Sequence, residues 1–403
     1  MGEAAATQVV RVWEVVTVVL VVVVVVVENN LFLSFMPYRL LKKHKAVAVF
    51  ILIAILLVVG GVYFYYRKTS EQTREVLREE GQHFQNEGEW IRAEQKFREA
   101  LALTSDPSQK AILKGVIAFN LYRNDPLGTP GREAVLLLKE TISDPAVSAG
   151  IRARSINDLA FLHDMSASDN FLRNVVFSGE PYESYLKDAG GNILGAVRRL
   201  YEEADKLRPT AFSKIEIAFK YSLMLAMGVE ENGLGSEEIA HRIQRYIKEA
   251  EPLMNPQQQP QNVFAYMHLM RATSLSISDM VLHNIEYSKI ESEYQEALTL
   301  SQEVFTLSRK EPDNYDARQI FIKASLGFAL SLASRFGEKR AGEETALVKQ
   351  IFSLDPVPFY LTTLEKIVQR LPDNTYMKSA FLGLARVSPE FHTFLTKHGW
   401  KLE

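Results

Sequence analysis

The sequence predicts an all-α fold, a solenoid of antiparallel helix pairs, and three observations support this prediction. Apolar residues recur at helical spacing almost throughout residues 67–403. No sustained alternation of apolar and polar residues in that range favours strands. The predicted helices form pairs with short polar connections. Stacked pairs of this kind bury a continuous core between neighbours without long-range strand pairing.

The clearest helix pair spans residues 77–107. The polar segment 86–89 contains a glycine and predicts the turn between the two helices. Gly81 lies inside the first helix, where a glycine costs about 1 kcal/mol relative to alanine. We therefore expect Gly81 to mark a close approach of the second helix, with Ala93 as the matching small residue.

Small and aromatic residues follow a fixed order in this pair: Gly81, Phe84, Trp90, Ala93, Phe97 and Ala100. Pro107 follows the second helix. This order resembles the tetratricopeptide repeat (TPR), a helix–turn–helix family. The resemblance implies that the six residues pack the helix pair and that stacked repeats form a superhelix. An ordinary helical hairpin with chance spacing is the alternative interpretation.

In the TPR family the first helix of each repeat lines a concave groove where peptides or helices dock. The resemblance places four residues of the clear repeat in that groove: Glu75, Arg78, Gln82 and Gln85. Relatives that clamp a terminal carboxylate carry lysine and asparagine where Arg78 and Gln82 stand, so such a clamp is not expected. A plain solvated helix face is the alternative for all four positions.

Further helices are predicted along the rest of the chain at 110–123, 132–143, 149–165, 193–207, 212–227, 237–250, 263–279, 285–308, 315–335, 343–354, 357–371, 375–385 and 389–398. The helix at 212–227 is strongly apolar and should be buried. Residues 166–191 are expected to be irregular. The polar, proline-bearing segment 255–262 is either a break between two sub-blocks or a long loop between helices.

Residues 46–66 form a continuous uncharged apolar run, long enough as a helix to cross about 30 Å of hydrocarbon. Aromatic residues gather at its end, in residues 63–66, as they do at membrane interfaces. We expect one uncleaved transmembrane helix. A cleavable signal peptide is the competing interpretation, but its apolar region is normally about 7–15 residues and ends at small residues.

Basic residues flank this run unequally. Lysines and arginines cluster in residues 36–45, and only Arg67 and Lys68 follow the run directly. Excess positive charge before a span favours a cytoplasmic N-terminus and a translocated C-terminal domain. Residues 36–45 are therefore expected to be a basic cytoplasmic segment, with residues 67–403 outside the cytoplasmic membrane.

Residues 1–35 are a low-complexity extension, in which residues 15–27 are almost pure valine. This run is short for a spanning helix. We expect residues 1–35 to be either non-structural or a mis-assigned start, with the natural start at Met36. A first membrane segment is the alternative, and the C-terminal domain would be outside under both interpretations.

Composition limits the function classes. The formal net charge is −3, which gives no basic surface signal for nucleic acid. The chain has no cysteine, which excludes disulfides, thiolate metal sites, cysteine nucleophiles and a lipidated-cysteine anchor. A bacterial envelope location fits this composition.

No catalytic, metal or cofactor site is predicted. His163 and Asp164 form a His–Asp pair, but the further ligands that a metal-dependent phosphohydrolase needs cannot be assembled. His268 and His283 could meet only by chance. The glycine-rich segment 190–192 follows no strand and lacks a phosphate-loop lysine, so it is typical of a helix entry turn.

These observations predict a membrane-anchored, extracytoplasmic TPR-like scaffold. It would contact protein partners through the helical groove and lipid through residues 46–66, in secretion or envelope assembly. The alternatives are an α-helical envelope enzyme with hydrolytic or glycan-directed activity, and a structural stalk. Neither a cofactor nor a nucleic-acid partner is expected.

Overall fold

The computed structural model describes residues 60–61, 68–85, 87–124, 129–167, 193–229, 233–307, 313–354 and 359–402. Two compact units are present, Met1–Glu75 and Val76–Glu403. The described residues of the first unit are helical. The valine run, the basic segment 36–45 and the predicted span 46–66 lie outside the described residues, except for Gly60 and Gly61.

The described part of the second unit is helical, with one isolated bridge at Leu234 and no strand. Residues 76–85 are helical, as are residues 68–75. The α-helices that follow are α3 Trp90–Ala102, α4 Pro107–Asn124, α5 Thr129–Ser143, α6 Ala149–Ala167, α9 Ile193–Leu207, α10 Ala211–Ala226, α11 Ser236–Ala250, α12 Gln261–Leu282, α13 Tyr287–Leu307, α14 Asp313–Phe336, α15 Ala341–Leu354, α16 Phe359–Gln369, α17 Tyr376–Val387 and α18 Pro389–Lys397.

The all-α prediction is confirmed for the described residues, and most predicted helices begin and end within a few residues of the observed bounds. The proline-bearing segment 255–262 contains the short 3₁₀ helix Pro256–Gln258 and leads directly into α12. The predicted burial of α10 is also observed. Its buried residues include Lys214, Glu216 and Lys220, which the apolar pattern of the helix did not predict.

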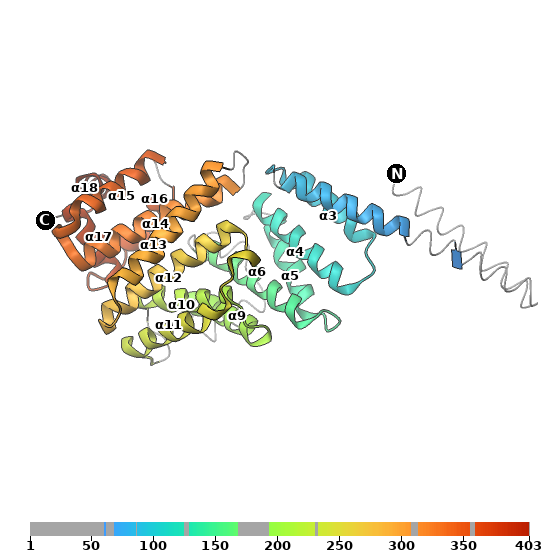
Figure 1. The fold of residues 1–403 in the computed structure, drawn as a ribbon, viewed down its shortest axis with the longest axis horizontal. Coiled ribbons are helices and arrows are strands. Elements are labelled where there is room, and N and C mark those ends of the chain that lie inside the picture. The colour runs from blue at the N-terminus through green and yellow to red at the C-terminus, as the bar shows by residue number, and fades with distance from the viewer. Residues whose placement is uncertain are drawn as a thin grey trace, which may run out of the picture. The chain divides into compact units, whose positions relative to one another are not determined.

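Helices that follow one another in the chain pack together, and so do alternate helices. Contacts join α4 to α6, α10 to α12, and α12 to α14. In Figure 1 the yellow α12 lies beside the green α10, with the orange α14 next along. Most of the core residues from Ala93 to Trp400 belong to one connected apolar cluster. Neighbour-to-neighbour burial is therefore the main source of stability.

Two contacts join helices that are far apart in sequence. Arg123 near the end of α4 forms an ion pair with Asp316 near the start of α14, with 2.7 Å between Nη2 and Oδ2. Helix α17 contacts both α10 and α14. Stacking between sequence neighbours alone would not produce these contacts.

Several residues that were expected to pack the first helix pair are buried in it. Ala93, Phe97 and Ala100 are buried in α3. A Cβ atom placed on Gly81 would lie 3.0 Å from two ring carbons of Phe97. The second helix therefore approaches Gly81 closely, through the flat Phe97 ring, and the role of Ala93 as the matching small residue stays a prediction.

The other aromatic positions of the pair lie at its edge. Phe84 and Trp90 are half-buried. The Arg92 guanidinium lies 3.9 Å from the centre of the Phe84 ring. The Trp90 ring meets Phe119 of α4 edge to face, with 6.0 Å between ring centres. Trp90 therefore links the first pair to the second one, an arrangement worth about 1 kcal/mol beyond the buried area.

One stretch of the described residues, Asp316–Leu354, is long and apolar enough to cross a membrane by length and composition. It lies in the middle of the chain, and 56% of its apolar window is buried inside the protein. A 3₁₀ turn with three charged residues, Gly337–Arg340, interrupts it. Because its α14 part packs against α12, α13, α15 and α17, we interpret it as core.

Candidate functional site

The four predicted groove positions differ in exposure. Glu75, in the first unit, is half-buried. In the second unit Arg78 and Gln82 are exposed, and Gln85 is half-buried. The Nδ2 of Asn120 in α4 donates a hydrogen bond to the Gln85 side-chain oxygen at 3.1 Å. Gln85 is therefore joined to the next helix pair.

A cavity of about 250 Å³ lies beside Gln85, between α4 and α6. We call it the α4–α6 cavity. Most of its wall is apolar, with Val116 and Phe119 from α4 and Phe161 from α6. Its lining comes mainly from two alternate helices, α4 and α6. In the TPR family the groove is likewise lined by alternate helices, the first of each repeat. The structure thus places one predicted groove residue, Gln85, on a real concavity.

One carboxyl group, that of Asp158 on α6, lies in the wall of this cavity. Asp158 is half-buried and makes no hydrogen bond within the described chain. Burial raises the pKa of its carboxyl to about 6, and the positive charge of Arg154 opposes this rise. Arg154 is the only other charged residue among the described residues of the cavity wall, and it is exposed.

Gly115 of α4 lies opposite this carboxyl. A Cβ atom placed on Gly115 would have one neighbour within 4 Å, the Oδ2 of Asp158, at 3.9 Å. Space is therefore left open beside Asp158, where a side chain at position 115 would fill it. Sequence analysis missed both residues, although Gly115 inside a predicted helix was a detectable signal.

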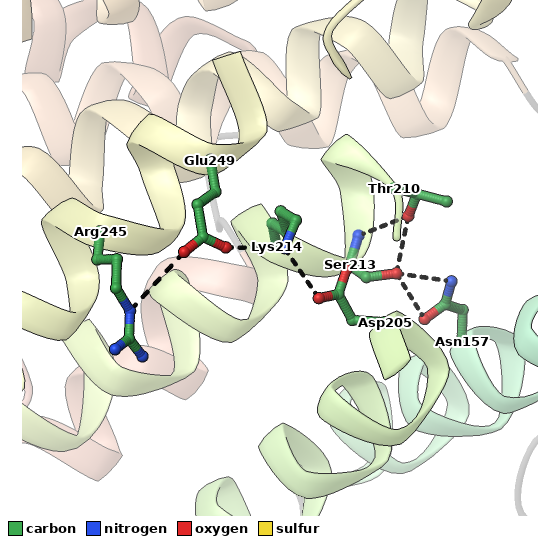
Figure 2. A network of polar contacts seen from close by, with 7 residues as sticks. All are labelled: Asn157, Asp205, Thr210, Ser213, Lys214, Arg245 and Glu249. Carbon is green, nitrogen blue, oxygen red and sulfur yellow. Dashed lines mark hydrogen bonds and ion pairs between the residues drawn. The ribbon is translucent and has the colours of Figure 1, made fainter. Parts of the chain in front are cut away.

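The residue before Asp158 has the opposite environment. Figure 2 shows Asn157 bonded to Ser213 at the start of α10, with 3.1 Å between Nδ2 and Oγ. Thr210, the N-cap of α10, also bonds to Ser213, with 2.8 Å between the two oxygens. The two neighbouring residues of α6 thus differ: Asn157 is tied into the α6–α10 contact, and Asp158 has no hydrogen-bond partner among the described residues.

The same network continues into α9 and α11. Lys214 contacts Asp205 and Glu249, each at 2.9 Å, and Arg245 lies 3.9 Å from Glu249 (Figure 2). Burial by itself would lower the pKa of Lys214. The hydrogen bonds to Glu249 and Asp205 have the larger combined effect, so the pKa is raised above its usual value. The ammonium group therefore stays charged and holds three helices together.

Short polar side chains also close the later contacts between alternate helices. Ser222 of α10 lies 3.4 Å from Ser274 of α12, between side-chain oxygens. Ser276 of α12 lies 2.8 Å from Ser331 of α14. Small hydroxyls allow close approach and satisfy each other, so these junctions are filled where the α4–α6 junction is hollow.

A second carboxyl with a raised pKa lies far from the cavity in sequence. Glu344 of α15 is fully buried, and neither side-chain oxygen has a hydrogen-bond partner. Burial and, to a smaller extent, the neighbouring Glu343 together raise its pKa to about 7, against the opposing charge of Arg340. Because Glu344 is inaccessible, its chemistry concerns stability and not binding.

The candidates for catalysis or metal binding are not brought together. His268 lies 2.6 Å from Glu293, between Nδ1 and Oε2, whereas His283 is the left-handed C-cap of α12. His163 and Asp164 lie in α6, but their side chains are outside the described set, as are residues 190–192. No group of three or more potential metal ligands occurs among the described residues.

No known protein family, curated protein or solved structure matches this chain. The resemblance to the TPR family therefore rests on the residues of the first helix pair alone. Function must be argued from the cavity and its lining.

Proposed function

We propose that the protein is a membrane-anchored scaffold that binds protein partners through a TPR-like array of antiparallel helix pairs. Residues 46–66 would be the single span, with the N-terminus inside and residues 67–403 outside the cytoplasmic membrane. Secretion or envelope assembly is the context that this arrangement suits. The contacts between alternate helices support the solenoid, because such contacts join the corresponding helices of successive repeats.

One observation carries the proposal: the α4–α6 cavity is lined by Gln85, a position that the TPR resemblance assigns to the groove. Its volume is below the roughly 300–1,000 Å³ of pockets that enclose a small-molecule ligand. A concavity of this size accepts a single side chain of a protein partner. Anchoring of one side chain in a pocket is how protein interfaces concentrate their binding energy.

An envelope enzyme is less well supported. Glycoside hydrolysis generally uses two carboxyl groups that flank the scissile bond. The described wall of the cavity carries one, Asp158. Acyl transfer would need a nucleophile and a base within hydrogen-bond reach of each other. Ser155 is the one hydroxyl in the described lining, and no histidine is among the described lining residues.

Site-specific photocrosslinking in native membranes tests the proposal. A photoreactive residue at position 85 should capture protein partners that mass spectrometry identifies. The matched control is position 95 on the exposed side of α3, which should capture far less. Equal capture at 85 and 95, or none at 85, would contradict a partner in the cavity. A reporter fused after Glu403 tests the orientation: activity only of a cytoplasmic reporter would reverse it.

A further inference from the structure

We propose that the α4–α6 cavity receives a lysine side chain of the partner protein, with the Asp158 carboxylate as its counter-ion. This inference rests on the proposed function and specifies the residue by which the partner is anchored. It is argued from the size of the cavity, its one carboxyl group and the space beside Gly115.

The shape and polarity of the cavity fit a lysine stem. The volume of about 250 Å³ accommodates one long side chain. Val116, Phe119 and Phe161 provide apolar contact for four methylene groups. Lysine commonly buries its hydrocarbon stem along apolar surface while its charged end meets a polar group. An aliphatic partner residue would fill the same walls but leave the carboxylate desolvated beside it.

The charge of the site favours a cation. Asp158 makes no hydrogen bond with any described residue, and covering the cavity would remove its remaining water. A buried carboxylate without a partner is costly, and a paired one is not. Arg154 would repel a second cation, but it is exposed, so solvent and salt weaken that repulsion.

The number of acceptors favours lysine over arginine. An ammonium group has three donors, whereas a guanidinium group has five in a fixed plane. The described polar acceptors in the wall are the side-chain oxygens of Asp158, Ser155 and Gln85. The Gln85 oxygen already accepts from Asn120. The two Asp158 oxygens and the Ser155 hydroxyl remain to accept from the three donors of an ammonium group, and an arginine would leave more of its five donors without partners.

Gly115 provides the entrance to the carboxylate. Its missing side chain leaves 3.9 Å between the Cβ position and Asp158 Oδ2. Alanine fits at this position, whereas leucine would extend into the space where the lysine end must lie. Gly115→Leu should therefore block binding by bulk alone, without any change in charge.

A zero-length crosslink tests the ion pair directly. A water-soluble carbodiimide activates a carboxyl group and joins it to an amine in contact with it, with loss of water to the carbodiimide. The full-length protein in native membranes should give a peptide in which Asp158 is joined to a lysine of another protein. Excess n-butylamine should suppress this crosslink, and excess butanol should not.

Variants separate charge from shape. Asp158→Asn should abolish the crosslink and reduce partner capture from position 85 by about tenfold, the usual effect of losing a hydrogen bond to a charged group. Asp158→Glu should restore part of the capture. Gly115→Leu should reduce capture and Gly115→Ala should not. Circular dichroism would establish that each variant is folded.

The outcomes distinguish the inference from the proposed function. Partner capture at position 85 with no lysine crosslink to Asp158, or with a crosslink confined to lysines of this chain, overturns the lysine inference and leaves the scaffold intact. Equal capture by the wild type and Asp158→Asn also overturns it. Failure to capture any protein at position 85 overturns both.

Discussion

Two helix junctions each include a glycine inside a helix, and they differ in the space beside it, which is filled at the first junction and open at the second. At the first junction the Phe97 ring fills the space beside Gly81, 3.0 Å from the position of a Cβ atom. At the second, Gly115 faces only the Asp158 carboxylate, 3.9 Å away. Tyr294 fills the space beside Gly327 of α14 as Phe97 does beside Gly81, again at 3.0 Å.

This difference distinguishes glycines that make room for a packed ring from a glycine that leaves open space. A glycine inside a helix costs about 1 kcal/mol, and close packing against a ring offsets that cost at Gly81 and Gly327. No ring contacts Gly115, so the protein gains no packing there. The open space instead becomes part of a cavity with a carboxyl group in its wall. That is the pattern expected of a site that is completed by another molecule.

The largest expected effect is on the filled junction. Phe97→Ala should lower the free energy of unfolding by about 3–5 kcal/mol, because a fully buried ring is replaced by a cavity. Chemical denaturation of the full-length protein in detergent, followed by circular dichroism, measures this change. The exposed Ile91 on the same helix provides the control: Ile91→Ala should change stability by less than about 0.5 kcal/mol.

The second effect concerns Glu344, whose carboxyl group also has a raised pKa but is fully buried and does not line the α4–α6 cavity. Its pKa rises from 4.5 to about 7 on folding, so the folded state binds the proton more tightly. The contribution of Glu344 to stability should therefore be greatest below about pH 4.5 and fall as the pH rises to about 7, by roughly 3 kcal/mol in total. Melting curves across this range would show the fall.

Glu344→Gln should abolish this contribution and make the protein more stable than the wild type at pH 8. The matched control is Glu343→Gln on the exposed side of the same turn, where the Arg340 ion pair lowers the pKa of the carboxyl. A stability difference between the wild type and Glu344→Gln that does not change between pH 5 and 7 would contradict the assignment of Glu344.

A smaller effect sharpens the glycine comparison. Gly81→Ala should destabilise the protein by about 1–3 kcal/mol, because the added methyl group forces the Phe97 ring to move. Gly115→Ala should stabilise it by up to about 1 kcal/mol, because helix propensity improves and nothing is displaced. Opposite signs in denaturant midpoints are the expected result. The same sign for both variants would show that the two junctions do not differ as described.

The smallest effect is the titration of Asp158 itself. Carbon-13 NMR of labelled aspartate should give a midpoint of about 6, raised by burial from 3.8. Because the folded pKa is the higher one, the contribution of Asp158 to stability should decline as the pH rises from about 4 to 6. The decline should be smaller than that of Glu344, because Asp158 is only half-buried and solvent screens its charge. Adding n-butylamine should lower the midpoint, since a bound cation favours the carboxylate. An unchanged midpoint with amine present would weaken the case for a cation site.

Local patterns predicted the helices because helix formation depends on neighbouring residues. The polar, glycine-bearing segment 86–89 predicted the turn, and apolar spacing predicted α10. The same spacing gave no sign of the ion pair between Glu216 and Lys220, although both are fully buried, because an i, i+4 pair is typical of an exposed helix face.

Sequence by itself determined that the described chain is helical and where most helices begin and end, since spacing, turns and caps act over a few residues. Only the tertiary structure decided that the Phe97 ring lies against Gly81, and that Gly115, Asp158 and Gln85 share one cavity. Those three residues come from three helices, and their meeting depends on how whole helices pack. No local sequence pattern encodes how closely residues on different helices approach one another.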